Sequence, residues 1–181
     1  MSPRVLAYII FMLSILLAAQ GACAEERKPT EYDVMAAYIY NFTKFVEWPA
    51  GKTSSDGATL IVGIIGRDTF GPALAAIEGK ETGKRKIRVR RDISLKTARS
   101  CDILFISNSE KEHLEEILEA VGDSGVLTVG DTKGYARQGV MINFYMEDNR
   151  VGFEINPTSV GRAGLRISSN LLKIARIVGT P

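Results

Sequence analysis

Few side chains in this sequence could perform acid–base or nucleophilic chemistry. The chain of 181 residues has one histidine, His113, which we expect on the exposed face of a helix among charged neighbours. A Ser-His-Asp or Cys-His arrangement would need that imidazole as its base, and a zinc site needs several ligands in register. We therefore expect no enzyme activity, no metal and no cofactor. An enzyme that uses carboxylates alone is the remaining catalytic alternative.

Glycines follow two of the expected strands. Gly66 and Arg67 come after an apolar run at 60–65, and Gly130 follows a second run at 126–129. Open α/β sheets bind ligands beyond the carboxyl ends of their strands, so these three residues form a candidate small-ligand site. The spacing around Gly66 is neither G-x-G-x-x-G nor a P-loop. An ordinary tight connection from strand to helix is the alternative.

The densest positive stretch comprises Lys80, Lys84, Arg85, Lys86, Arg88, Arg90 and Arg91. It has no interleaved aromatic residues of the kind that stack on bases, and a formal net charge of +2 gives no long-range field. We expect a solvated strand edge that charge protects against aggregation. Nucleic acid is not an expected partner.

The first 24 residues read as a cleavable secretory signal. Arg4 precedes an apolar run at 5–19, and Ala22 and Ala24 are the small residues that a signal peptidase accepts. An uncleaved anchor helix and a lipoprotein acylated at Cys23 are the alternatives. After cleavage, residues 25–31 are expected to be a mobile leader and 32–181 a single domain. Only Cys101 remains, which excludes an internal disulfide.

Strand and helix patterns alternate through the first part of the mature chain. Continuous apolar runs predict strands buried on both faces at 60–65, 103–106 and 126–129. Period-two alternation predicts a half-exposed strand around Ile87 and Val89. Helical spacing predicts helices at 32–48, 68–77 and 110–120, and a final one after Ser168.

The pattern changes near the C-terminus. Two strand-like runs, 140–146 and 150–155, flank Glu147, Asp148 and Asn149, which predicts a hairpin. The whole pattern predicts an α/β fold: a mostly parallel sheet with helices on both faces and an antiparallel C-terminal hairpin.

The segment from Ala36 to Pro49 (AAYIYNFTKFVEWP) carries more aromatic residues than one helix face can bury. Surplus aromatic side chains near a helix end are typical anchors of protein interfaces. A well-packed first helix with Trp48 against its C-terminal end is the alternative.

Three segments resemble the YfiR family of periplasmic proteins: 36–49, 139–144 (GVMINF), and 151–156 (VGFEIN) followed by 162–172 (RAGLRISSNLL). The resemblance implies a compact α/β domain that often dimerises and represses a membrane-bound diguanylate cyclase by binding its periplasmic sensor domain. It implies Phe144 and Glu154 on the functional surface. Trp48, Asn143, Asn156 and Arg162 occupy motif positions whose role is either structural or in partner binding. Family members can carry disulfides, which a single mature cysteine does not allow within one chain.

Two functions are therefore expected for an exported, non-catalytic domain. The first is a periplasmic regulator that binds and represses an inner-membrane diguanylate cyclase through Phe144, Glu154, Trp48 and Arg162, lowering cyclic di-GMP and biofilm formation. The second is a periplasmic small-ligand binding protein that feeds another membrane sensor, such as a histidine kinase, with the ligand at Gly66, Arg67 and Gly130. The two can coexist if the ligand controls the partner.

Overall fold

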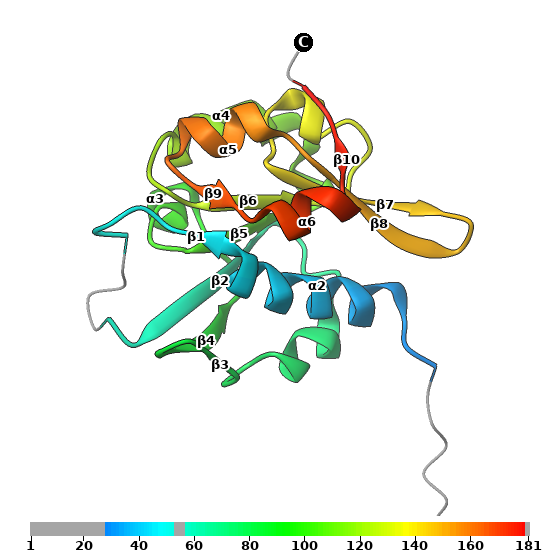
Figure 1. Cartoon of the computed structure of the whole chain (residues 1–181), viewed down its shortest axis with the longest axis horizontal. Coiled ribbons are helices and arrows are strands. Elements are labelled where there is room, and N and C mark those ends of the chain that lie inside the picture. Colours follow the sequence, from blue (N-terminus) through cyan, green and yellow to red (C-terminus); the bar gives the residue numbers. More distant parts are fainter. Residues whose placement is uncertain (1–27, 53–56, 180–181) are drawn as a thin grey trace, which may run out of the picture.

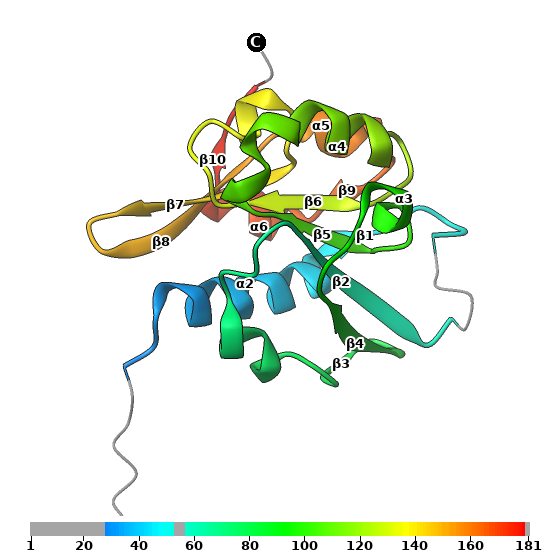
Figure 2. The ribbon, with the colours of Figure 1, turned by 180° about the vertical axis from the view of Figure 1, so that it is seen from behind.

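The computed structural model describes residues 28–52 and 57–179. It has a mixed eight-stranded sheet with the strand order β10-β8-β7-β6-β5-β2-β4-β3. Helices lie on both faces of this sheet, as Figures 1 and 2 show from opposite sides. The α/β fold class expected from the sequence is confirmed.

Five adjacent strands of the sheet run parallel to one another: β4 (Arg85–Arg90), β2 (Thr59–Ile65), β5 (Ile103–Ile106), β6 (Leu127–Gly130) and β7 (Ile142–Glu147). β8 (Arg150–Ile155) then pairs with β7 as the expected antiparallel hairpin. The edges are two-residue strands: β10 (Arg176–Ile177), parallel to β8, and β3 (Glu81–Thr82), antiparallel to β4. A separate pair joins β1 (Val46–Glu47) to β9 (Arg166–Ile167).

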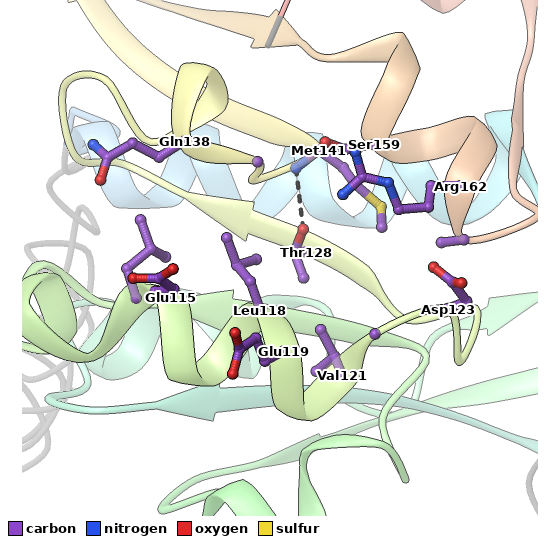
Figure 3. Close-up of a pocket in the computed structure, with 14 residues that line it drawn as sticks. Glu115, Leu118, Glu119, Val121, Asp123, Thr128, Gln138, Met141, Ser159 and Arg162 are labelled. Carbon is purple, nitrogen blue, oxygen red and sulfur yellow. Dashed lines mark hydrogen bonds between the residues drawn. The ribbon is translucent and has the colours of Figure 1, made fainter. Parts of the chain in front are cut away.

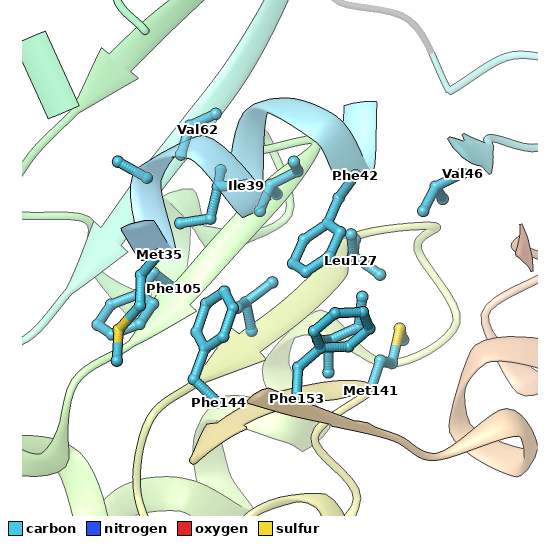
Figure 4. Packing of buried hydrophobic residues seen from close by; sticks show 14 of the residues in the cluster. Met35, Ile39, Phe42, Val46, Val62, Phe105, Leu127, Met141, Phe144 and Phe153 are labelled. Carbon is cyan, nitrogen blue, oxygen red and sulfur yellow. The ribbon is translucent and has the colours of Figure 1, made fainter. Parts of the chain in front are cut away.

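Helix α2 (Glu31–Phe45) covers one face of the sheet. It begins with a capping box in which the Thr30 hydroxyl accepts the Asp33 N–H and Asp33 bonds back to the Thr30 N–H. Its buried stripe includes Met35, Ile39 and Phe42, which point at sheet residues such as Phe105 and Leu127 in Figure 4. The short 3₁₀ helix η2 (Gly71–Ala76) packs on the same side.

The opposite face carries α3 (Leu95–Ala98) and α4 (Leu114–Val121), with the 3₁₀ segments η3 (Asn108–His113) and η4 (Ala136–Gln138). A second apolar cluster lies under them and includes Leu104, Ile117 and the buried Cys101. Helix α5 (Pro157–Arg162) lies beside α4 on this side of the sheet in both views. The two clusters explain the continuous apolar strands, because successive side chains of β2 and β5 enter different clusters.

Several expected boundaries differ from the structure. The first helix ends at Phe45, so Trp48 lies beyond it; the segment at 110–120 divides into η3 and α4. The last helix, α6 (Ser169–Ile174), stops early, and the chain continues as β10. The C-terminal hairpin is therefore not the sheet edge, because β10 covers β8.

Two expectations concern the N-terminal residues. The signal sequence at 1–24 lies outside the described residues. Of the expected leader at 25–31, Glu31 already belongs to α2 and Thr30 is its cap. Among residues 28–52 and 57–179, no helix is long and apolar enough to cross a membrane.

Candidate functional site

The β7–β8 hairpin extends sideways beyond the helical layers (Figures 1 and 2). Its two-residue loop is Asp148-Asn149, with positive φ angles of 48° and 61°, and Glu147 pairs with Arg150. Aspartate and asparagine tolerate this left-handed backbone, which matches the twist of a tight hairpin. The loop thus fixes the register that places Glu154 opposite Asn143.

Arg176 on β10 organises the charged face of this hairpin. Its Nη2 lies 3.2 Å from both carboxylate oxygens of Glu147, and its Nη1 lies 3.9 Å from Glu154. Its guanidinium carbon is 4.3 Å from the centre of the Tyr145 ring. We call Tyr145, Glu147, Glu154 and Arg176 the Arg176 cluster. Glu154, with 17 % of its side chain exposed, thus has a cationic neighbour within its own chain.

Large apolar side chains are exposed on the strands that carry the Arg176 cluster and at the end of α6. Alternation along β7 and β10 turns Met146 and Ile177 to the opposite face of the sheet from Arg176. Ile177 on β10 is 52 % exposed, Ile174 at the end of α6 is 66 % exposed, and Met146 on the hairpin is 39 % exposed. Strand β10 has one neighbouring strand, β8, so its other side is an open edge. We call β10 with Met146, Ile174 and the Arg176 cluster the β10 edge.

Phe144 is buried beneath the hairpin. Its ring is 1 % exposed and lies 5.8 Å from the Phe42 ring and 6.1 Å from the Tyr38 ring of α2, as Figure 4 shows for Phe42. The sequence reasoning placed Phe144 on a partner-binding surface, whereas the structure places it in the core between α2 and the hairpin. Period two explains this, because Ile142 and Phe144 share the apolar face of β7.

Trp48 lies away from the β10 edge, at the start of β5. Its Nε1 donates to the backbone oxygen of Asp102 at 3.2 Å, and the Arg85 guanidinium lies 5.4 Å from its ring centre. Arg85 also pairs with the buried Asp102 carboxylate at 2.9 Å, which accepts the Ile61 N–H at 2.7 Å. These contacts give Trp48 a packing role in this structure.

Gly66 and Arg67 lie at the topological switch point of the sheet. The chain leaves β2 toward β4 on one side, and β5 lies on the other. This point is filled: the Arg67 N–H donates to Ser109 Oγ at 2.9 Å, and a Cβ on Gly66 would lie 2.5 Å from the same oxygen. Gly130 is packed against the Tyr135 ring, which would lie 2.7 Å from its Cβ. Close packing therefore accounts for both glycines.

A cavity lies elsewhere, between α4 and α5 (Figure 3). It has a volume of about 480 Å³. Arg162, expected from the sequence to be a partner-binding residue, lines it together with Leu118, Thr128 and Met141. None of the residues of the Arg176 cluster lines this cavity.

Sequence reasoning missed Arg176 and the α4–α5 cavity. Apolar spacing at Leu171, Leu172 and Ala175 predicted a helix that continued through Arg176, and a two-residue strand has too little pattern to be recognised. The cavity joins segments far apart in the chain. One signal was visible in advance: Glu115, Glu119 and Asp123 recur every four residues, as along one side of a helix.

The described residues offer little for catalysis. His113 is exposed and lies 3.6 Å from Glu110. Burial raises the pKa of the Cys101 thiol to about 11, so it is a poor nucleophile at neutral pH. No group of three or more His, Cys, Asp or Glu within residues 28–52 and 57–179 could hold a metal ion.

A family model described as YfiR/HmsC-like matches residues 32–176. The chain belongs to this family. YfiR/HmsC-like proteins are periplasmic regulators and are not known as enzymes. The match begins in α2, includes the strands β1 to β9 and ends at Arg176, the first residue of β10.

Solved structures resemble this YfiR/HmsC-like chain in fold alone. One is the ABC domain from Streptococcus pneumonia in complex with L-Trp, with 9 % identity and a TM-score of 0.51 over 82 % of this chain. Another is a conserved domain protein from Vibrio cholerae, with 11 % identity and a TM-score of 0.53 over 83 % of this chain. The match covers 60 % of each of those chains.

Proposed function

We propose that this chain is a periplasmic regulator that binds and represses the sensor domain of an inner-membrane diguanylate cyclase, lowering cyclic di-GMP and biofilm formation. Membership of the YfiR/HmsC-like family supports the proposal, because that family is associated with membrane diguanylate cyclase partners. The structural observation that carries it is the β10 edge. This surface combines an open strand with exposed apolar side chains.

The β10 edge suits a protein partner for two reasons. An open strand presents unpaired backbone groups to which a partner segment can add. Met146, Ile174 and Ile177 add apolar area that burial would remove from water, and methionine, arginine and tyrosine are common in interface centres.

Glu154 acts in this proposal through Arg176. The Glu147 and Glu154 carboxylates hold the guanidinium over the Tyr145 ring. This fixes a cation on one face of the β10 edge, while Met146 and Ile177 occupy the other face. Phe144 supports the hairpin from below. Trp48 and Arg162 lie outside the β10 edge, so the proposal gives them no partner contact.

Deletion of the gene tests the proposed function. Repression predicts that cyclic di-GMP rises in the deletion strain and that the wild-type gene restores the lower level. Ile177→Asp, which places a charge on the β10 edge, should fail to restore it. Phe45→Asp is the matched control, because Phe45 is also an exposed apolar residue, at 38 %, but lies next to β1.

An unchanged cyclic di-GMP level after deletion would contradict repression of a cyclase. Full restoration by Ile177→Asp would instead contradict the β10 edge as the surface. The family resemblance also suggests a homodimer. Sedimentation of the purified protein, with and without Ile177→Asp, tests whether a second copy uses the same edge.

A further inference from the structure

We propose that the cavity between α4 and α5 binds a small organic cation with an apolar body. The cavity volume of about 480 Å³ lies within the usual range for small-molecule sites. The proposed ligand class follows from three features of the lining: its apolar floor, its row of carboxylates and one unpaired hydroxyl.

The floor of the cavity is apolar. Leu114, Val121 and Met141 line it and are at most 4 % exposed, and Leu118 is partly buried beside them. Leu114, Leu118 and Val121 recur at helical spacing on α4. Figure 3 shows Leu118 and Val121 on α4 and Met141 across the cavity. An aliphatic or aromatic ligand body would lose its hydration on this floor.

The α4 wall carries a row of carboxylates. Glu115 and Glu119 are one helical turn apart, Asp123 lies just beyond the end of the helix at Val121, and all three line the cavity. Like charges at the spacing of Glu115 and Glu119 destabilise a helix. Glu119 also lies in the last turn of α4, which contains no basic residue and where the helix dipole disfavours an anion.

These carboxylates have no internal counter-charge. The side-chain carboxylates of Glu115, Glu119 and Asp123 make no ion pair or hydrogen bond within residues 28–52 and 57–179. Arg99 reaches the end of α4, but its Nε donates to the Ala120 backbone oxygen. Arg162 is the only basic residue in the lining, so three carboxylates face one guanidinium, and a cationic ligand would reduce the imbalance.

Ser159 is a separate sign of a ligand. It is 6 % exposed and lines the cavity from α5. Its N–H donates to Asn156, while its hydroxyl has no partner in the described part of the chain. The oxygen itself is accessible, because it is not among the fully buried side-chain atoms without a partner, and Ser159 lines the cavity. A ligand with a hydroxyl or carbonyl group beside its apolar body would satisfy it.

A titration with three probes tests the proposal. Hexylammonium, hexanoate or hexanol is added to the isotope-labelled exported protein, and the amide chemical shifts report binding. The three probes share an apolar chain and differ in charge. We expect saturable shifts at Leu118, Gly122 and Gly139, with hexylammonium binding about tenfold more tightly than hexanoate and more weakly as salt rises. Tighter or equal binding of hexanoate, or shifts confined to other regions, would overturn the proposal.

Variants of α4 separate charge from fold. Glu119→Gln combined with Asp123→Asn should weaken hexylammonium binding about tenfold. Glu116→Gln is the matched control, because Glu116 is exposed on the same helix and does not line the cavity; its binding should not change. An unchanged affinity in the double variant, with a spectrum that shows the native fold, would overturn the proposal. The result is independent of any cyclase partner.

Discussion

The two edges of the main sheet expose different kinds of side chain. At one edge β3 covers part of β4, and the exposed side chains there include Lys84, Lys86, Arg88 and Arg90. At the other edge β10 lies beside exposed isoleucines, and its charges are already paired within the Arg176 cluster. Among the described residues, three of the four exposed large apolar side chains (Met146, Ile174 and Ile177) belong to the β10 edge.

This difference suits the two edges to different roles: one edge is protected against association, and the other can bind a partner. A row of exposed cations repels a second copy and stays hydrated, so it protects a strand edge against association. An edge with apolar side chains and a fixed ion-pair cluster is suited to association. The same sheet therefore has one edge that resists pairing and one that is available to a partner.

The largest expected effect concerns the core beneath the β10 edge. Phe144→Ala should lower the free energy of unfolding by about 3–5 kcal/mol, because it leaves a cavity among the rings of Tyr38, Phe42 and Phe153. Urea denaturation measures this. Phe45→Ala, on an exposed side chain, is the control and should cost less than about 1 kcal/mol. A similarly small cost for Phe144→Ala would show that its ring is not a core element.

A second effect distinguishes Arg85 and Lys86, two neighbouring cations at the edge formed by β3 and β4, which we call the basic edge. Arg85→Ala should lower the free energy of unfolding by about 1–3 kcal/mol, because the buried Asp102 carboxylate loses its partner. Lys86 forms an ion pair with Glu81 at 3.9 Å, and its side chain is 70 % exposed. Lys86→Ala should therefore change the free energy of unfolding by less than about 0.5 kcal/mol. Equal effects in thermal or urea unfolding would contradict this distinction.

A charge reversal compares the two edges directly. Glu154→Lys places a second cation beside Arg176, so we expect affinity for the sensor domain to fall about tenfold. The free energy of unfolding should change by less than about 1 kcal/mol, because the pair is long and partly solvated. Glu81→Lys makes the same change on β3, beside Lys86, and should leave the affinity unchanged. Titration calorimetry measures both; equal losses would remove the distinction between the edges.

Sequence patterns predicted the elements that are long or regular. The apolar run of β2 and the hairpin around Asp148 and Asn149 are confirmed, because burial on two faces and turn chemistry both act locally. Strand β10 could not be predicted, since two residues have no period and their pairing with β8 depends on the path of α6.

The candidate site was harder to predict than the fold. Motif resemblance placed Phe144 and Glu154 together, but they lie on opposite faces of the hairpin because Phe144 pairs with Phe153 and Glu154 is the next residue along β8. Gly66 and Gly130 do lie near the carboxyl ends of strands, yet Ser109 and Tyr135 fill the space beside them. A cavity depends on which side chains meet across elements, as α4 and α5 do, and no local pattern contains that information.

Binding of the cyclase sensor domain to paired edge variants tests the central claim most directly. One protein carries Ile174→Asp and Ile177→Asp at the β10 edge; the other carries Lys86→Glu and Arg88→Glu at the basic edge. We expect the first pair to weaken binding at least about 30-fold, as loss of an apolar interface centre does, and the second to leave it unchanged. Equal weakening by both pairs, or a loss confined to the basic-edge pair, would contradict recognition through the β10 edge.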